Sequence, residues 1–192
     1  NKFAASFGTL SSLLRFLKSG QVHLKISLIA AIGALIGSPI GTQIQMFISD
    51  DLLNKMMLII LPCVAVFMVF RRDLGADNQT ELAPFSGKIA VQSFLIGLLI
   101  GGYDGLVGPG TGTFLILAFT AVLGIPLLSS SGSAKVVNFA SNIAALVVYL
   151  IHGQVLFAVG IPALICAICG YQVGANMALK GGGKVVRGLI FV

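Results

Sequence analysis

The chain has 192 residues, of which 57% are hydrophobic and only 9% are charged, and its formal net charge is +6 at pH 7. This composition excludes an ordinary soluble domain, whose surface needs many more charged side chains. The basic residues lie at the ends of apolar runs rather than along one polar face. We therefore expect no nucleic-acid partner and take the lipid bilayer as the partner instead.

Long uncharged runs predict several membrane-spanning helices, because about 20 apolar residues are enough to cross a bilayer. A glycine-rich hairpin interrupts the series in the second half of the chain. The predicted fold class is all-α, a polytopic transmembrane helical bundle with broken helices and a re-entrant hairpin. The predicted helices span residues 2–18, 22–44, 52–70, 131–151 and 155–173, and a last one runs from Lys184 onwards.

The chain repeats itself without a gap at an offset of 133 residues. Lys2 aligns with Lys135, and the tripeptide Gly-Gln-Val at 20–22 aligns with the same tripeptide at 153–155. An ungapped tripeptide together with a matched lysine is hard to obtain by chance. The chain therefore divides into three parts. These are a first transmembrane module at 1–70, a polar linker at 71–88 and a second transmembrane module at 89–192.

The second module contains the glycine-rich hairpin, and we expect its counterpart in the first module to precede Asn1. Three crossings and a hairpin make an odd number, so the second module enters from the opposite side, which predicts two inverted repeats. Nearly all basic residues then fall on one side, and Lys55 stands almost alone on the other. The positive-inside rule makes the basic side, with the linker at 71–88, cytoplasmic. We predict a multi-pass protein of the inner (plasma) membrane.

The segment from Gly101 to Phe114 contains six glycines and Pro109. Both residue types disfavour a helix, and broken backbone inside a membrane is tolerated only where it is buried or lines a wet cavity. We predict a break here and a half-helix that begins within residues 110–113, whose amides and positive dipole end favour an anion. The alternative is a glycine-lined packing crossing between helices.

Four polar residues of the next predicted helix lie on one face, since Ser131, Lys135, Asn138 and Asn142 are spaced by four, three and four residues. A lysine inside a membrane helix costs about 2.5 to 3.5 kcal/mol on insertion scales and usually faces the bundle interior with a partner. An anion is a natural partner. The alternative, that Lys135 snorkels to lipid phosphates, is weakened by its recurrence at the same repeat position as Lys2.

Asp104 is the one acidic residue in the apolar part of the second module. It could couple transport to a proton or a sodium ion, or form an ion pair with Lys135 or Lys2. It could equally cap the broken backbone beside Gly105. His152 is interpreted as an interfacial turn residue rather than a proton relay.

The chain offers little for catalysis. Cys166 and Cys169 form a C-x-x-C in an apolar run, and without a second pair they are interpreted, like Cys63, as small buried helix residues. With two histidines and six acidic residues, we predict no enzyme, no metal site and no cofactor.

Two segments resemble the TauE/SafE family of sulfite exporters. They are Gly-Tyr-Asp-Gly-Leu-Val-Gly-Pro-Gly-Thr-Gly-Thr-Phe at 102–114 and Ser-Ala-Lys-Val-Val-Asn-Phe-Ala-Ser-Asn at 133–142. The resemblance covers essentially the whole chain, apart from a first glycine-rich hairpin. It implies two duplicated modules and the export or import of sulfite, organosulfonates or related small organic anions. The residues to which it assigns site roles are Lys2, Asp104, Gly108 to Thr113, Lys135, Asn138 and Asn142.

The predicted function is secondary transport of a small anion by alternating access around a site at the middle of the membrane. A passive anion channel is the alternative, and a scaffold or sensor is a reading without transport. Oligomeric state has no signature in the sequence. The predicted substrate-binding residues are Gly108, Gly110, Thr111, Gly112, Thr113, Lys135, Asn138, Asn142 and Lys2, and Asp104 is the candidate for proton or sodium coupling.

Overall fold

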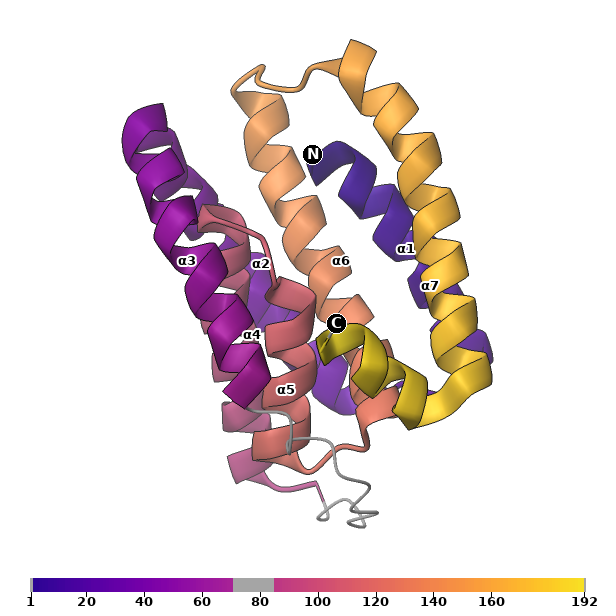
Figure 1. Ribbon diagram of the computed structural model, residues 1–192. Coiled ribbons are helices and arrows are strands. Elements are labelled where there is room, and N and C mark those ends of the chain that lie inside the picture. Colours follow the sequence, from indigo (N-terminus) through magenta and orange to yellow (C-terminus); the bar gives the residue numbers. More distant parts are fainter. Residues whose placement is uncertain (1, 71–84, 192) are drawn as a thin grey trace.

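The structure is a computed structural model that describes residues 2–70 and 85–191, so most of the predicted linker at 71–88 lies outside the described residues. Within these ranges the chain is helical and forms no strand (Figure 1). The helices are α1 (Lys2–Lys18), α2 (Leu24–Phe47), α3 (Asp50–Phe70), α4 (Gly87–Leu106), α5 (Thr111–Leu123), α6 (Leu127–Ile151) and α7 (Phe157–Phe191).

Four helices in the described part of the chain are long and apolar enough to cross a membrane: α2, α4, α6 and residues Phe157–Val186 of α7. Large apolar side chains, among them Leu28, Ile32 and Ile165, are exposed on these helices. Such faces suit contact with lipid chains, which replace water as the solvent. The predicted all-α transmembrane bundle is confirmed.

Helices α4 and α5 form the predicted hairpin, whose turn lies inside the bundle while both outer ends lie at the same end of the molecule (Figure 1). The break covers only Val107 to Gly110, because α4 stays helical to Leu106. Gly108 has φ 92° and Gly110 has φ 81°, values at which a side chain is strained. The predicted break and the start of the half-helix within residues 110–113 are confirmed, while Gly101 to Leu106 remain helical.

The earlier glycines of this segment have a packing role instead. Gly97, Gly101 and Gly105 recur every fourth residue on α4, and they face small residues of α2, namely Ala30, Ala34 and Ser38. A Cβ atom added to Gly101 would lie 2.7 Å from the Cα of Ala34, so the two backbones touch. The alternative of a small-residue crossing is correct for this half of the segment.

The remaining differences concern helix ends and the cysteines. Helix α6 begins at Leu127 rather than at residue 131. The two helices predicted after residue 155 form the single helix α7, which is kinked at Gly182 (φ 62°, ψ −159°). Cys166 and Cys169 are exposed on α7, so the expectation of burial is wrong for both, and the side chain of Cys63 lies outside the described residues.

The core joins the hairpin to both modules. Apolar side chains of α2, α4, α5 and α6, with Ile125 of the α5–α6 connection, form the largest buried cluster, in which Leu115, Phe119, Ile125 and Val137 have no exposed surface. A second cluster joins Phe16 of α1 to Leu127 of α6 and Ala175 of α7. The two clusters thus pack the hairpin against α2 and α6, and α1 against α6 and α7.

Candidate functional site

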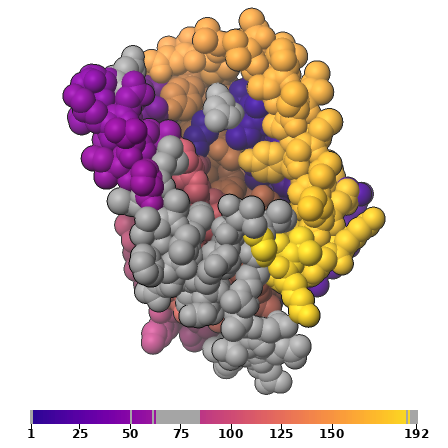
Figure 2. Space-filling model, viewed as in Figure 1, coloured from indigo at the N-terminus to yellow at the C-terminus, as the bar shows by residue number. Residues whose placement is uncertain are grey.

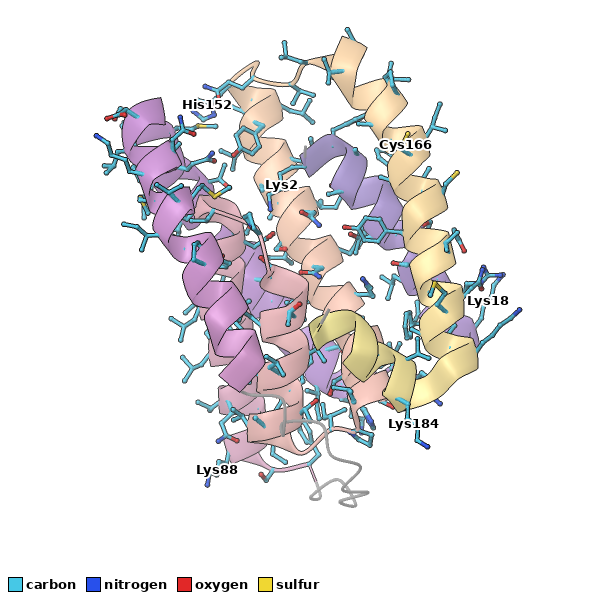
Figure 3. All side chains as sticks on the ribbon, in the orientation of Figure 1. Lys2, Lys18, Lys88, His152, Cys166 and Lys184 are labelled. Carbon is cyan, nitrogen blue, oxygen red and sulfur yellow. The ribbon has the colours of Figure 1, made fainter. Side chains whose placement is uncertain are left out.

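A cavity of about 970 Å³ lies beside the turn of the α4–α5 hairpin. Figure 2 shows the molecule hollowed between α3, α6 and α7, with α1 at the bottom of the hollow. Its wall includes Gln45, Met57 and the α6–α7 connection at 154–156. This connection begins just after His152, which lies at one end of the bundle in Figure 3. The predicted site residues that line it are Lys2, Asp104, Gly108, Gly110, Thr111, Gly112, Lys135, Asn138 and Asn142.

Lys2 and Asp104 form an ion pair inside this cavity. The ammonium Nζ of Lys2 lies 2.7 Å from Oδ2 of Asp104, and it also donates to the backbone carbonyl of Asp104 at 2.8 Å. The side chains are 16% and 7% exposed. Lys2 lies between the two ends of the bundle in Figure 3, far from Lys18, Lys88 and Lys184. Of the alternatives that the sequence left open for Asp104, the structure shows the ion pair with Lys2.

Two hydroxyl groups complete the surroundings of the Asp104 carboxylate. Ser141 of α6 donates to Oδ2 at 2.7 Å, and Thr111 of α5 donates to Oδ1 at 3.0 Å. The Thr111 hydroxyl also lies 2.6 Å from the carbonyl oxygen of Gly108. Charge-assisted hydrogen bonds of this kind stabilise an ionised carboxylate. Among the described residues, Asp104 receives no backbone amide, so it ties helices together rather than capping one.

Lys135 occupies the equivalent repeat position but has a different partner. Its Nζ lies 5.1 Å from the centroid of the Tyr171 ring on α7, a cation–π contact. It forms no ion pair with any side chain that the structure describes. Because Lys135 also lines the cavity, its ammonium lies in the interior rather than among headgroups at a helix end.

The start of α5 faces the same cavity. Gly110 caps the helix in a left-handed conformation, and the amides of Gly112 and Thr113 donate no hydrogen bond within the described part of the chain. A Cβ atom added to Gly112 would lie 3.2 Å from the side-chain nitrogen Nδ2 of Asn138, so α5 and α6 are in contact here. Thr113 is not among the lining residues.

Asn142 contacts the first module. Its amide nitrogen lies 3.4 Å from the hydroxyl of Thr9, which is the residue that aligns with it in the repeat. Asn138 precedes it by one turn and lines the cavity beside Gly112. The structure therefore brings together all predicted site residues except Thr113.

Three functional neighbours were missed from the sequence. Ser141 donates a hydrogen bond to Asp104, and the ring of Tyr171 contacts the ammonium of Lys135. The hydroxyl of Tyr103 donates to the carbonyl of Pro109 at 2.6 Å and so stabilises the turn. Ser141 could have been found, since it follows Asn138 by three residues on the same helix face. Tyr171 could not have been found in this way. The residue at the equivalent repeat position is Ser38, and the two residue types do not indicate a shared role.

The described residues contain no group of three or more His, Cys, Asp or Glu side chains that could hold a metal ion. The site consists instead of two ammonium groups, one carboxylate, amides and hydroxyls around a cavity. This set of groups can bind an anion without any metal ion.

Comparison with known proteins identifies the family. The family described as "Sulfite exporter TauE/SafE" matches residues 1–192. The chain belongs to this family.

Three curated relatives illustrate the TauE/SafE match. "Probable membrane transporter protein ORF9" of Sinorhizobium sp is 31% identical over all of this chain and 72% of its own length. A "Probable membrane transporter protein" of Haemophilus influenzae is 30% identical, with 100% and 74% covered. "Probable membrane transporter protein YfcA" of Escherichia coli K12 is 27% identical, with 100% and 70% covered.

No solved structure matches the chain. The resemblance seen in the glycine-rich and Lys135 segments is confirmed by the family match, and the chain is a TauE/SafE membrane transporter. Its membrane-spanning helices agree with that membership.

Proposed function

We propose that this TauE/SafE protein is a secondary transporter that moves a small anion, sulfite, an organosulfonate or a related sulfur-containing or organic anion, by alternating access around the cavity. One observation carries the proposal: the half-buried Lys135 lines the cavity and has no carboxylate partner in the described part of the chain. It also lies on the face of α6 that meets the start of α5. An unpaired charge within a membrane is costly, so it implies a ligand of opposite charge.

In the proposed complex, Lys135 neutralises the anion. The amides of Gly112 and Thr113 and the positive end of α5 then receive its oxygens, as helix N-termini commonly do. Asn138 and Asn142 orient the remaining oxygens, and the left-handed Gly108 and Gly110 let the backbone approach. The Thr111 hydroxyl is already donating to Asp104, so its contribution is its position in the turn.

Contacts between repeat positions support the proposal of two inverted repeats. Helices α1 and α6, which align at the offset of 133, run in opposite directions in Figure 1. Thr9 and Asn142 occupy the same repeat position and touch each other, as residues on a two-fold axis must. Gly8 lies against Tyr171, and the equivalent pair, Ser141 and Ser38, is joined by a hydrogen bond of 2.8 Å.

The distribution of charge supports a location in the inner membrane with one end in the cytoplasm. Lys18, Lys88 and Lys184 lie towards one end of the bundle and His152 lies at the other (Figure 3). The positive-inside rule makes the lysine-bearing end cytoplasmic. The cavity wall at 154–156 then faces the opposite side. Residues 71–84 of the linker and the side chain of Arg187 lie outside the described residues.

The experiment is a flux assay on the protein reconstituted in sealed vesicles, with sulfite, thiosulfate, methanesulfonate and acetate as test anions. We expect saturable uptake of at least one sulfur oxyanion that responds to an imposed proton or sodium gradient, and loss of that uptake in Lys135→Ala. Conductance in planar bilayers without any coupling would identify a passive channel. Absence of flux for every anion, with the protein folded, would contradict the proposal.

A further inference from the structure

The charged groups of the cavity do not balance. The lining contains two lysines, Lys2 and Lys135, and one carboxylate, Asp104, with no other acidic or basic residue among the described residues that form the wall. In their ionised forms these groups leave one net positive charge. The charge of the bound anion then decides the net charge of the loaded site.

The carboxylate is a fixed part of this site. Asp104 accepts hydrogen bonds from three helices: from Lys2 of α1 at 2.7 Å, Thr111 of α5 at 3.0 Å and Ser141 of α6 at 2.7 Å. Lys2 has two acceptors on the same residue, the carboxylate and the carbonyl oxygen of Asp104. The charge of Lys2 is therefore already neutralised, and the free positive charge resides on Lys135.

We propose that Asp104 makes this site selective for singly charged oxyanions over doubly charged ones. The inference deepens the proposed function and rests on it. A monoanion beside Lys135 gives a loaded site without net charge, whereas a dianion leaves one uncompensated negative charge within the membrane. Net charge in a medium of low dielectric constant is strongly disfavoured. Without Asp104 the two lysines would together match a dianion.

The test uses methanesulfonate and sulfate. Both have oxygen atoms on a tetrahedral sulfur, but methanesulfonate carries one negative charge near neutral pH and sulfate carries two. Binding of each anion to the purified protein is measured by thermal stabilisation and by competition, at constant ionic strength. The ratio of the two dissociation constants is the readout. We expect the unmodified protein to favour methanesulfonate.

Asp104→Asn keeps the shape of the side chain and removes its charge. We expect it to shift the ratio towards sulfate by about tenfold or more, which corresponds to about 1.4 kcal/mol. The double variant Lys2→Gln with Asp104→Asn restores one net positive charge and is expected to return the ratio to that of the unmodified protein. Asp51→Asn, which removes an exposed carboxylate 78% accessible to solvent, is the matched control and should leave the ratio unchanged.

Asn138→Asp provides an independent arm if Asp104→Asn does not fold. It adds a negative charge to the same wall with little change in shape, so the ratio should move further towards methanesulfonate. The inference would be overturned if the unmodified protein preferred sulfate, or if neither Asp104→Asn nor Asn138→Asp changed the ratio of the dissociation constants. Either result would leave the proposal of anion transport standing. If the unmodified protein binds and transports neither these anions nor sulfite, thiosulfate or acetate, the proposed function fails and the inference fails with it.

Discussion

Lys2 of α1 and Lys135 of α6 occupy the same position in the sequence repeat, yet their side chains contact different partners. Lys2 is held by the carboxylate and the carbonyl of Asp104. Lys135 lies over the ring of Tyr171 and has no ion-pair partner among the described side chains. Both line one cavity. The same residue type at matching positions of the sequence repeat therefore has two different electrostatic environments.

The comparison separates two roles that one residue type can have inside a membrane. Lys2 joins α1 to the turn of the hairpin, since its partner Asp104 also binds α5 and α6. Lys135 keeps its charge available to the cavity. We therefore expect substitutions of Lys2 to act mainly on stability and substitutions of Lys135 to act mainly on anion binding.

Lys135→Ala should have the largest effect on anion binding. A hydrogen bond to a charged group contributes roughly 1.5–3 kcal/mol, so we expect anion affinity to fall by about tenfold or more. Stability without anion should fall by no more than about 1 kcal/mol, the contribution of the cation–π contact with Tyr171. Isothermal titration with the transported anion measures the change. Lys55→Ala, which removes an exposed lysine paired with Asp51, is the control. Equal affinities in the two variants would contradict the assigned role.

Lys2→Met should instead destabilise the fold. It leaves the Asp104 carboxylate buried without its ammonium partner, and removal of one member of a buried ion pair costs up to about 3–5 kcal/mol. Thermal unfolding in detergent measures the loss. Adding Asp104→Asn removes the unpaired charge and should recover most of the stability. A double variant no more stable than Lys2→Met would show that the ion pair is not the cause.

Substitutions of Tyr171 test the restraint on Lys135 and should have a smaller effect. Tyr171→Leu removes the ring beneath the ammonium and should cost about 1 kcal/mol of stability, in the range of exposed and partly desolvated cation–π contacts. Tyr171→Phe keeps the ring and should be almost neutral. Chemical unfolding of the two variants in one detergent makes the comparison. Equal losses in the two variants would assign the effect to the missing hydroxyl group rather than to the ring beneath the ammonium.

Thr9→Val should have the smallest effect. It removes the hydroxyl that accepts from Asn142 across α1 and α6 while keeping the side-chain volume. Hydrogen bonds between membrane helices average about 0.6 kcal/mol, and the distance of 3.4 Å is long, so we expect a loss no larger than this. Thermal unfolding measures it. A loss of several kcal/mol would mean that this contact, and not the Lys2–Asp104 pair, joins the two modules.

Much of the fold follows from the sequence because apolar length determines which segments cross a membrane. The bounds of α1 were predicted correctly, and those of α2 and α3 to within three residues. The glycine-rich segment was harder, since glycine serves both as a helix breaker and as a small packing residue. The spacing of four shared by Gly97, Gly101 and Gly105 is the signal that distinguishes the packing half. The kinked continuity of α7 through Gly182 had no such signal.

The candidate site was predicted from residue chemistry rather than from distance. Lysine and aspartate in apolar sequence indicated buried charge, and the structure gathers them around one cavity. The sequence left open which lysine would pair with Asp104, because that choice depends on how α1 lies against the hairpin. Thr113 was included for its place in the motif, but the helix turns it away from the lining.

The close crossing of α2 and α4 has a mechanical consequence. Because the backbones touch at Gly37 and Gly101, sliding one helix along the other would force main-chain atoms into each other, and parting them would leave a void that no side chain fills. Under the alternating access proposed above, we expect these two helices to move as one rigid unit, although one precedes and the other follows the linker. The boundary between the moving parts would then differ from the boundary between the two modules predicted from the sequence.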